Sequence, residues 1–158
     1  MKRGETTGKK VVVAWVTEWK ATHKDVNHLQ SDYAEVDTKI ILHVLDATAD
    51  TATELSICSP DTDVLVLAIR HYPQMCPNKS FVTGSATTRR TIKLQPIVEA
   101  LGSAKPATLP AFHALTGTDN LGSFSEKGKP TCWKELEEAS ESILRSLANL
   151  KVKAKVFF

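Results

Sequence analysis

Cysteine is scarce in this sequence, and its spacing suggests neither of the residue's common structural uses. The three cysteines, Cys58, Cys76 and Cys132, are odd in number, far apart and without a Cys-x-x-Cys pair. A zinc knuckle or a disulfide framework needs a closer or more regular set of cysteines. The pattern therefore favours a reducing intracellular compartment, the nucleus or the cytoplasm.

Long apolar segments and a strong net charge are also absent. Residues 1–8 contain no apolar signal core, and no segment approaches the length of a membrane span, so we expect no membrane partner. The formal net charge of +2 is too small to indicate a nucleic-acid ligand by itself. Basic residues are only locally enriched, at 89–93, 127–129 and 151–155.

Strand-like and helix-like segments alternate along the 158 residues, a length typical of one domain. Apolar runs predict strands at 11–16, 55–59 and 81–82, and the polar segment 17–30 predicts a loop with weak helix. Helical spacing and capping residues predict helices at 32–49, 93–101, 106–116 and 130–150. The apolar run 64–69 fits either a strand or a helix. The alternation predicts an α/β domain with a parallel sheet.

Five acidic residues in three clusters are the strongest functional signal: Glu35 with Asp37, Asp61 with Asp63, and Asp119. Each cluster lies at an element boundary, where a parallel α/β fold can bring it to the carboxyl ends of the strands. Converging carboxylates repel one another unless a cation lies between them. Two hard divalent cations bound by oxygen would relieve that repulsion, and such two-metal sites mainly hydrolyse phosphodiesters.

Each acidic cluster also has a purely structural interpretation. Glu35 stands three residues after Asp32, which is the spacing of a capping box. Asp61 and Asp63 follow a proline, where aspartate is a routine turn residue, and the third cluster follows a glycine that can end a helix. Ordinary packed or surface roles are expected for two histidines on helical segments, His43 and His113.

Four runs of the sequence resemble, in this order, the PIN-like nuclease fold in its flap-endonuclease and Asteroid-like branch. The resemblance covers about residues 31–136. The runs are Glu35-Val-Asp37-Thr-Lys-Ile-Ile-Leu-His-Val-Leu, Ser59-Pro-Asp-Thr-Asp63-Val-Leu-Val-Leu, Phe112-His-Ala-Leu-Thr-Gly117-Thr-Asp119-Asn, and Gly122-Ser-Phe-Ser-Glu-Lys-Gly128-Lys-Pro-Thr-Cys-Trp133. The last run is similar to the family's glycine-containing turn, which joins two helices and holds the backbone of a duplex.

The resemblance implies a PIN-like three-layer fold, with a mostly parallel central sheet, helices on both faces and a helical C-terminal third. It implies one domain over residues 1–158, with its core at about 11–137 and a C-terminal helix and tail. The implied activity is that of a metal-dependent endonuclease, a hydrolase acting on phosphodiester bonds. The family's catalytic and metal-binding roles, with Mg²⁺ or Mn²⁺ and two ions if the site is complete, would fall on Glu35, Asp37, Asp61, Asp63 and Asp119.

The expected partner is nucleic acid, DNA in preference to RNA. Lys127 and Lys129 flank Gly128 in the turn before the helix predicted at 130–150. A glycine lets the backbone approach a phosphate closely, and a helix N-terminus adds hydrogen-bond donors. Arg89 and Arg90 are expected to add a second contact with the phosphate backbone.

The sequence departs from the family pattern before its first acidic cluster. The family's catalytic set begins with aspartates on or near N-terminal strands, whereas the strand predicted at 11–16 ends in Thr17-Glu18. Asn120 also stands where flap endonucleases carry an aromatic residue. We therefore expect the later part of a nuclease domain, as in an N-terminally incomplete copy. Two functions stay open: an active nuclease, or a catalytically degenerate domain that binds nucleic acid or protein.

Overall fold

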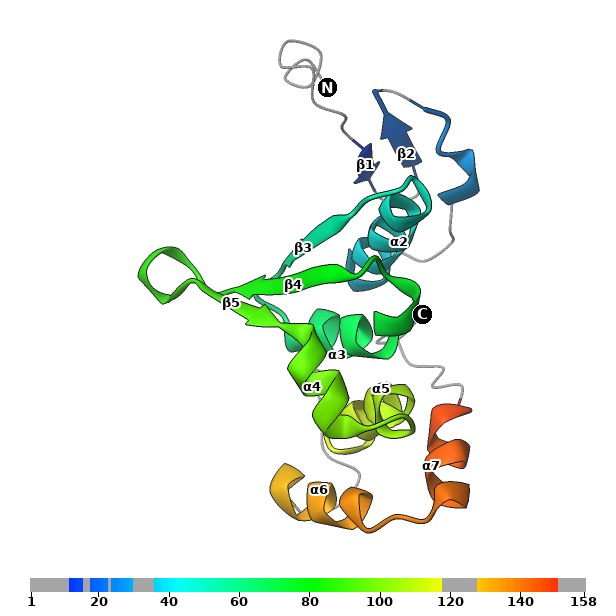
Figure 1. Ribbon diagram of the computed structural model, residues 1–158, viewed down its shortest axis with the longest axis vertical. Coiled ribbons are helices and arrows are strands. Elements are labelled where there is room, and N and C mark those ends of the chain that lie inside the picture. The colour runs from blue at the N-terminus through cyan, green and yellow to red at the C-terminus, as the bar shows by residue number, and fades with distance from the viewer. Residues whose placement is uncertain (1–11, 16–17, 23, 30–35, 118–127, 151–158) are drawn as a thin grey trace.

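The computed structural model describes residues 12–15, 18–22, 24–29, 36–117 and 128–150. These residues form a mixed α/β structure with six α-helices, a three-stranded mixed sheet and a separate two-stranded sheet (Figure 1). The strands are β1 (Val12–Trp15), β2 (Glu18–Ala21), β3 (Glu54–Cys58), β4 (Asn78–Thr83) and β5 (Arg90–Lys93). The helices are α2 (Val36–Ala49), α3 (Thr62–Arg70), α4 (Leu94–Leu101), α5 (Lys105–Leu115), α6 (Lys129–Glu137) and α7 (Glu141–Ala148). Three short 3₁₀ turns complete them, η1 (Asn27–Leu29), η2 (Tyr72–Gln74) and η3 (Ala86–Thr88).

The three-stranded sheet has the order β3-β4-β5, with β4 at its centre. β3 and β4 run parallel, from the pair Glu54 and Asn78 to the pair Cys58 and Val82. Their crossover contains α3, because parallel neighbours need a long connection. β5 is antiparallel to β4, because the short connection at 84–89 reverses the chain. The strands predicted at 55–59 and 81–82 are confirmed, but the described sheet is mixed rather than mostly parallel.

The first predicted strand pairs differently from our expectation. β1 pairs antiparallel with β2 in its own two-stranded sheet, and Trp15 is the register partner of Glu18. Only two residues separate these paired positions, and so short a connection can join only antiparallel strands. Residues 18–21, which we expected in a loop with weak helix, are therefore a strand. Val13 is 43% exposed, so β1 is not buried throughout, although an apolar run of this kind is typical of a buried strand.

The apolar run 64–69, which fitted two kinds of element, lies in helix α3. The helix begins after Asp61, whose backbone is extended and whose Oδ1 accepts the N–H of Asp63 at 2.9 Å. This N-cap hydrogen bond satisfies one of the donors that a first helical turn leaves unpaired. Five of the nine α3 residues are buried. Val64 is fully buried in a core that also contains Phe81 of β4 and Leu94 of α4.

The C-terminal third is helical, as predicted, but the single helix expected at 130–150 is two helices. α6 ends at Glu138, whose N–H donates to the carbonyls of Leu136 and Lys134. Ser140, before α7, has an extended backbone. A straight helix over this span would extend for about 30 Å. The break instead lets α7 pack on α5. The helices predicted at 93–101 and 106–116 are confirmed, and α2 confirms the described part of the helix predicted at 32–49.

Two hydrogen bonds show that α3 and α5 lie antiparallel against each other. Arg70, at the end of α3, donates from Nη1 to the carbonyl of Ala107 in the first turn of α5 at 2.6 Å. His113, near the end of α5, contacts Asp63 in the first turn of α3. The two contacts hold both ends of the helix pair. No helix in the described ranges is long and apolar enough to cross a membrane.

Phe81→Ala should lower the free energy of unfolding by about 3–5 kcal/mol, because it empties a fully buried position in the central strand. Equilibrium unfolding in urea measures this change. Val36→Ala is the control, since the Val36 side chain is 69% exposed on α2 and its loss should cost less than about 0.5 kcal/mol. Equal losses in the two variants would contradict the core described above.

Acid should destabilise the fold in part through His71, which follows α3. Burial lowers the pKa of His71 below its ordinary value of 6.5, with a smaller opposing effect from the Nδ1 contact with Gln74. The unfolded chain takes up a proton near that ordinary value, whereas the folded protein does so only at lower pH. The unfolded state therefore binds more protons as the pH falls below 6.5, and stability is lost toward the lowered folded-state pKa.

His71→Gln should therefore reduce the loss of unfolding free energy between about pH 7.5 and about pH 5.5. Urea unfolding at both pH values, in parent and variant, gives the comparison. Burial also lowers the pKa of His43, so part of the acid sensitivity should remain. An identical pH dependence in the two proteins would show that His71 makes no contribution.

Candidate metal centre

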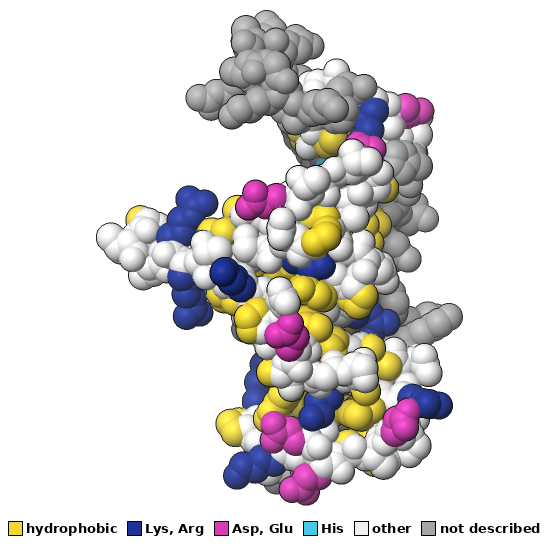
Figure 2. Space-filling view, in the orientation of Figure 1, with side chains coloured by type: hydrophobic (Ala, Val, Ile, Leu, Met, Phe, Trp, Pro, Cys, Tyr) yellow, Lys and Arg dark blue, Asp and Glu magenta, His cyan; other side chains and the backbone are white. Residues whose placement is uncertain are grey.

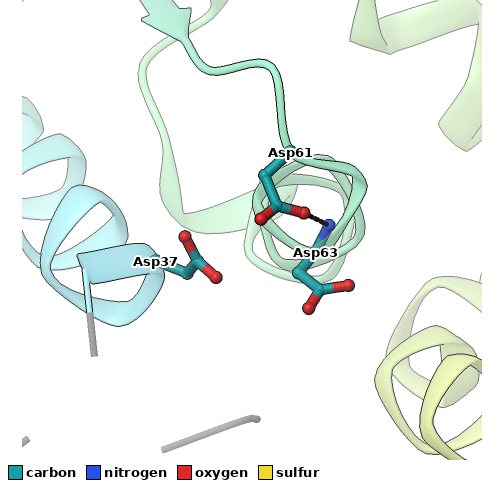
Figure 3. A group of neighbouring side chains, drawn as sticks. All are labelled: Asp37, Asp61 and Asp63. Atoms are coloured by element: carbon teal, nitrogen blue, oxygen red, sulfur yellow. Dashed lines mark hydrogen bonds between the residues drawn. The ribbon is translucent and has the colours of Figure 1, made fainter. Parts of the chain in front are cut away.

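Three of the five predicted acidic residues come together at the N-terminus of α3. Asp37 projects from the first turn of α2, Asp61 is the N-cap of α3, and Asp63 lies in the first turn of α3 (Figure 3). One carboxylate oxygen of each lies within 4.8 Å of the others. None of the three residues is fully buried, so the cluster is accessible to solvent. Oxygen donors at such spacing suit a hard divalent cation such as Mg²⁺ or Mn²⁺.

The local sequence explains why two carboxylates occupy this helix end. The Ser59 Oγ accepts the N–H of Asp61 at 3.1 Å, and Asp61 in turn caps the helix through Asp63 N–H. The partial positive charge at a helix N-terminus stabilises nearby carboxylates. Asp61 thus has a structural role as an N-cap, which differs from the turn role that the sequence suggested. A carboxylate has about four lone-pair sites, so the cap does not exhaust its capacity to bind a cation.

Asp63 has a partner that the sequence analysis did not assign. The Nε2 of His113 lies 2.6 Å from Asp63 Oδ1, and the two side chains are only 12% and 18% exposed. On its other edge, His113 Nδ1 lies 3.5 Å from the ammonium of Lys129, the first residue of α6. His113 is therefore a packed histidine, as expected, and its ring also touches a candidate ligand. Its signal in the sequence was a polar side chain directly after Phe112 in the helix predicted at 106–116.

The remaining predicted ligands fall outside the described residues. Glu35 and Asp119 lie there, as does Lys127 of the predicted basic turn. Gly128 has an extended backbone and is the N-cap of α6. Lys129 lies beside His113, so the described part of this turn approaches the acidic cluster.

Arg89 lies between η3 and β5, Arg90 is the first residue of β5, and both are exposed. Figure 2 shows Lys and Arg side chains around the projecting end of the β4–β5 hairpin. Arg89 also lines a pocket of about 340 Å³ together with Ser59, Pro60 and Gly84. That pocket lies at the carboxyl ends of the parallel strands β3 and β4, where ligands of α/β sheets commonly bind.

Gly84 shapes the rim of this pocket. Its φ of 81° is in the left-handed region, and an added Cβ would lie 2.4 Å from the carbonyl oxygen of Thr88. The chain can turn this tightly only without a side chain at 84. The turn places Arg89 over the residues that lead into Asp61.

Comparison with protein-family models, with curated proteins and with solved structures found no match to this chain.

Proposed function

We propose that this chain is a divalent-metal-dependent nuclease-like domain that acts on phosphodiester bonds of nucleic acid. The observation that carries the proposal is the meeting of Asp37, Asp61 and Asp63 from two helices within 4.8 Å. The order and context of these acids also resemble the PIN-like nuclease pattern, and we propose a PIN-like three-layer arrangement as the fold. A parallel strand pair with an acidic cluster after β3 supports it.

The three aspartates fit Mg²⁺ or Mn²⁺, because both ions take carboxylate oxygens and retain several waters. A bound ion would supply Lewis acidity toward a phosphate oxygen and toward a water molecule. Asp37 of α2 and Asp63 of α3 would bind the ion from two different helices. Asp61 would bind it as well, while its side chain still caps α3. Glu35 and Asp119 are proposed to complete the ligand set on the strength of the same resemblance.

The basic residues near this centre support a polyanionic substrate. Arg89 lines a pocket with Ser59 and Pro60, the two residues before Asp61, and Arg90 is exposed next to it in the chain. Lys129 of α6 lies 3.5 Å from His113, which contacts Asp63. Cationic side chains around an acidic centre can hold the phosphates on either side of the one that reacts. We propose DNA rather than RNA as the substrate, with Lys127 and Gly128 as further backbone contacts.

A catalytically degenerate binding domain is the alternative function. Two of the acids have structural roles that favour this alternative: Asp61 caps α3, and Asp63 pairs with His113. In this alternative, the same basic residues bind nucleic acid and no bond is cleaved.

Asp61→Asn should weaken cation binding without unfolding the protein. Asparagine is as good an N-cap as aspartate, so the variant keeps the cap and removes one negative charge. Calorimetric titration with Mn²⁺ should show a dissociation constant at least about tenfold weaker than that of the parent. Saturating Mn²⁺ should stabilise the parent by about 2.7 kcal/mol at 100 times the dissociation constant, and the variant much less.

Glu54→Gln is the matched control for this experiment. Glu54 is an exposed carboxylate at the opposite end of β3, and its neutral variant should bind Mn²⁺ like the parent. Cleavage of duplex and branched DNA, with RNA in parallel, is then measured with Mg²⁺ and Mn²⁺. Cation-dependent cleavage that Asp61→Asn abolishes supports the nuclease. Cation binding and DNA binding without cleavage by the parent would support the degenerate domain.

Arg89→Ala/Arg90→Ala should weaken DNA binding for all sequences alike. Phosphate contacts act through release of counterions, so losing two of them should reduce the slope of log affinity against log salt by up to about 2. Fluorescence anisotropy over a salt series measures both quantities. Lys134→Ala is the control, because Lys134 is exposed in the last turn of α6. An unchanged slope in the double variant would remove the two arginines from the proposed interface.

A further inference from the structure

We infer that His113 is a positioning residue for the metal centre, which fixes the carboxylate of Asp63 in the direction that cation binding requires. The inference rests on the proposed cation site and adds to it a residue from a third helix. Its evidence is the contact of 2.6 Å between His113 Nε2 and Asp63 Oδ1.

The contact joins elements that are far apart in the sequence. Fifty residues separate Asp63 in the first turn of α3 from His113 in the last turn of α5. Both side chains are largely shielded from water, so the hydrogen bond is stronger than an exposed one would be. Asp63 has one rotatable bond between Cβ and its carboxylate, and an N–H donor on Oδ1 stops that rotation. The carboxylate is then held where one of its oxygens lies within 4.8 Å of an oxygen of Asp37 and of Asp61.

The Asp63 carboxylate can only accept a hydrogen bond, so the 2.6 Å contact requires a proton on His113 Nε2, and the position of Lys129 agrees with that tautomer. A lysine ammonium has three donors and no acceptor, so at 3.5 Å it can only donate to His113 Nδ1. Nδ1 must then present a lone pair, and the proton of the neutral ring lies on Nε2, which faces Asp63. The contacts on the two edges of the ring therefore select the same tautomer. Groups in this position around metal ligands orient the ligand and tune its affinity for the ion.

A tether between α3 and α5 is the purely structural interpretation of the same bond. Arg70 and Ala107 already join the other ends of these helices, so a second clamp would add to stability. The two interpretations predict different measurements. A tether contributes to the unfolding free energy of the metal-free protein, whereas a positioning residue also changes the dissociation constant of the folded protein for the cation.

The test compares three variants by calorimetric titration with Mn²⁺, each checked for folding by its thermal melting curve. His113→Leu removes the donor, and His113→Asn places an amide donor too close to α5 to reach Asp63. Both should weaken Mn²⁺ binding by about 10-fold or more. His113→Gln places its amide nitrogen near the position of Nε2 and should restore binding to within about threefold of the parent. His71→Gln, at the opposite end of α3, should leave the dissociation constant unchanged.

The Asp63→Asn background tests whether His113 acts through Asp63. There, His113→Leu should cause no further loss of Mn²⁺ affinity, because two residues that act as one unit are not additive. Long-range ¹H–¹⁵N spectra of the parent, assigned by the signal lost in His113→Gln, should show the proton on Nε2. A proton on Nδ1 with none on Nε2 would overturn the inference, because the contact with Asp63 would then lack its donor.

The outcomes separate this inference from the function on which it rests. A parent that binds Mn²⁺, with His113→Leu and His113→Asn variants that melt earlier but bind equally well, would leave the metal centre standing and reduce His113 to a tether. A parent that binds no Mn²⁺ would overturn the proposed metal centre and the positioning role together.

Discussion

The position at which α3 begins determines both the core and the candidate site. Asp61 caps the helix directly after β3, and its side chain accepts the N–H of Asp63. This start sets the rotation of the helix, so that Val64 and four further residues are buried. The same start leaves Asp61 and Asp63 at the exposed end, beside Asp37 of α2. A shift of one residue would turn the apolar face by about 100° and disperse the acids.

Three carboxylates this close need positive charge nearby, and the described residues supply some of it. The helix N-terminus contributes its partial charge, and Lys129 lies behind His113 on the side of α5 and α6. These groups reduce the repulsion without occupying the space between the acids. The N-cap and the metal site are therefore compatible interpretations of one geometry, because a carboxylate can accept a backbone N–H and bind a cation through different lone pairs.

The antiparallel pair of α3 and α5 couples the C-terminal part of the chain to the site. Arg70 holds α5 at one end, and Asp63 meets His113 at the other. Lys129 extends this series of contacts to α6, although more than sixty residues separate it from Asp63 in the sequence. The helical C-terminal third is thus part of the surroundings of the centre, since the side chain that touches a candidate ligand comes from α5 and its neighbour from α6.

Local signals in the sequence determined most of the elements and the most informative acids. Apolar runs located β3 and β4, capping residues located α4 and α5, and the pairing of Asp61 with Asp63 after an apolar strand singled out two of the acids. These features depend on hydrogen bonds and periodicity within a few residues, which a sequence displays directly. The choice between strand and helix at 64–69 was not decidable in this way, because a short apolar run satisfies both periodicities.

Tertiary contacts alone decided the pairing of β1 with β2, the break between α6 and α7, and the partner of Asp63. Each of these three features depends on which part of the chain, far away in the sequence, a segment packs against. The spacing of residues within the segment does not determine that packing. A histidine that packs inside a fold, as His113 does in α5, needs a hydrogen-bond partner, because a buried ring nitrogen without one is costly. Only the packing of α5 against α3 could identify that partner as Asp63, because the interaction acts over 2.6 Å in space and fifty residues in sequence.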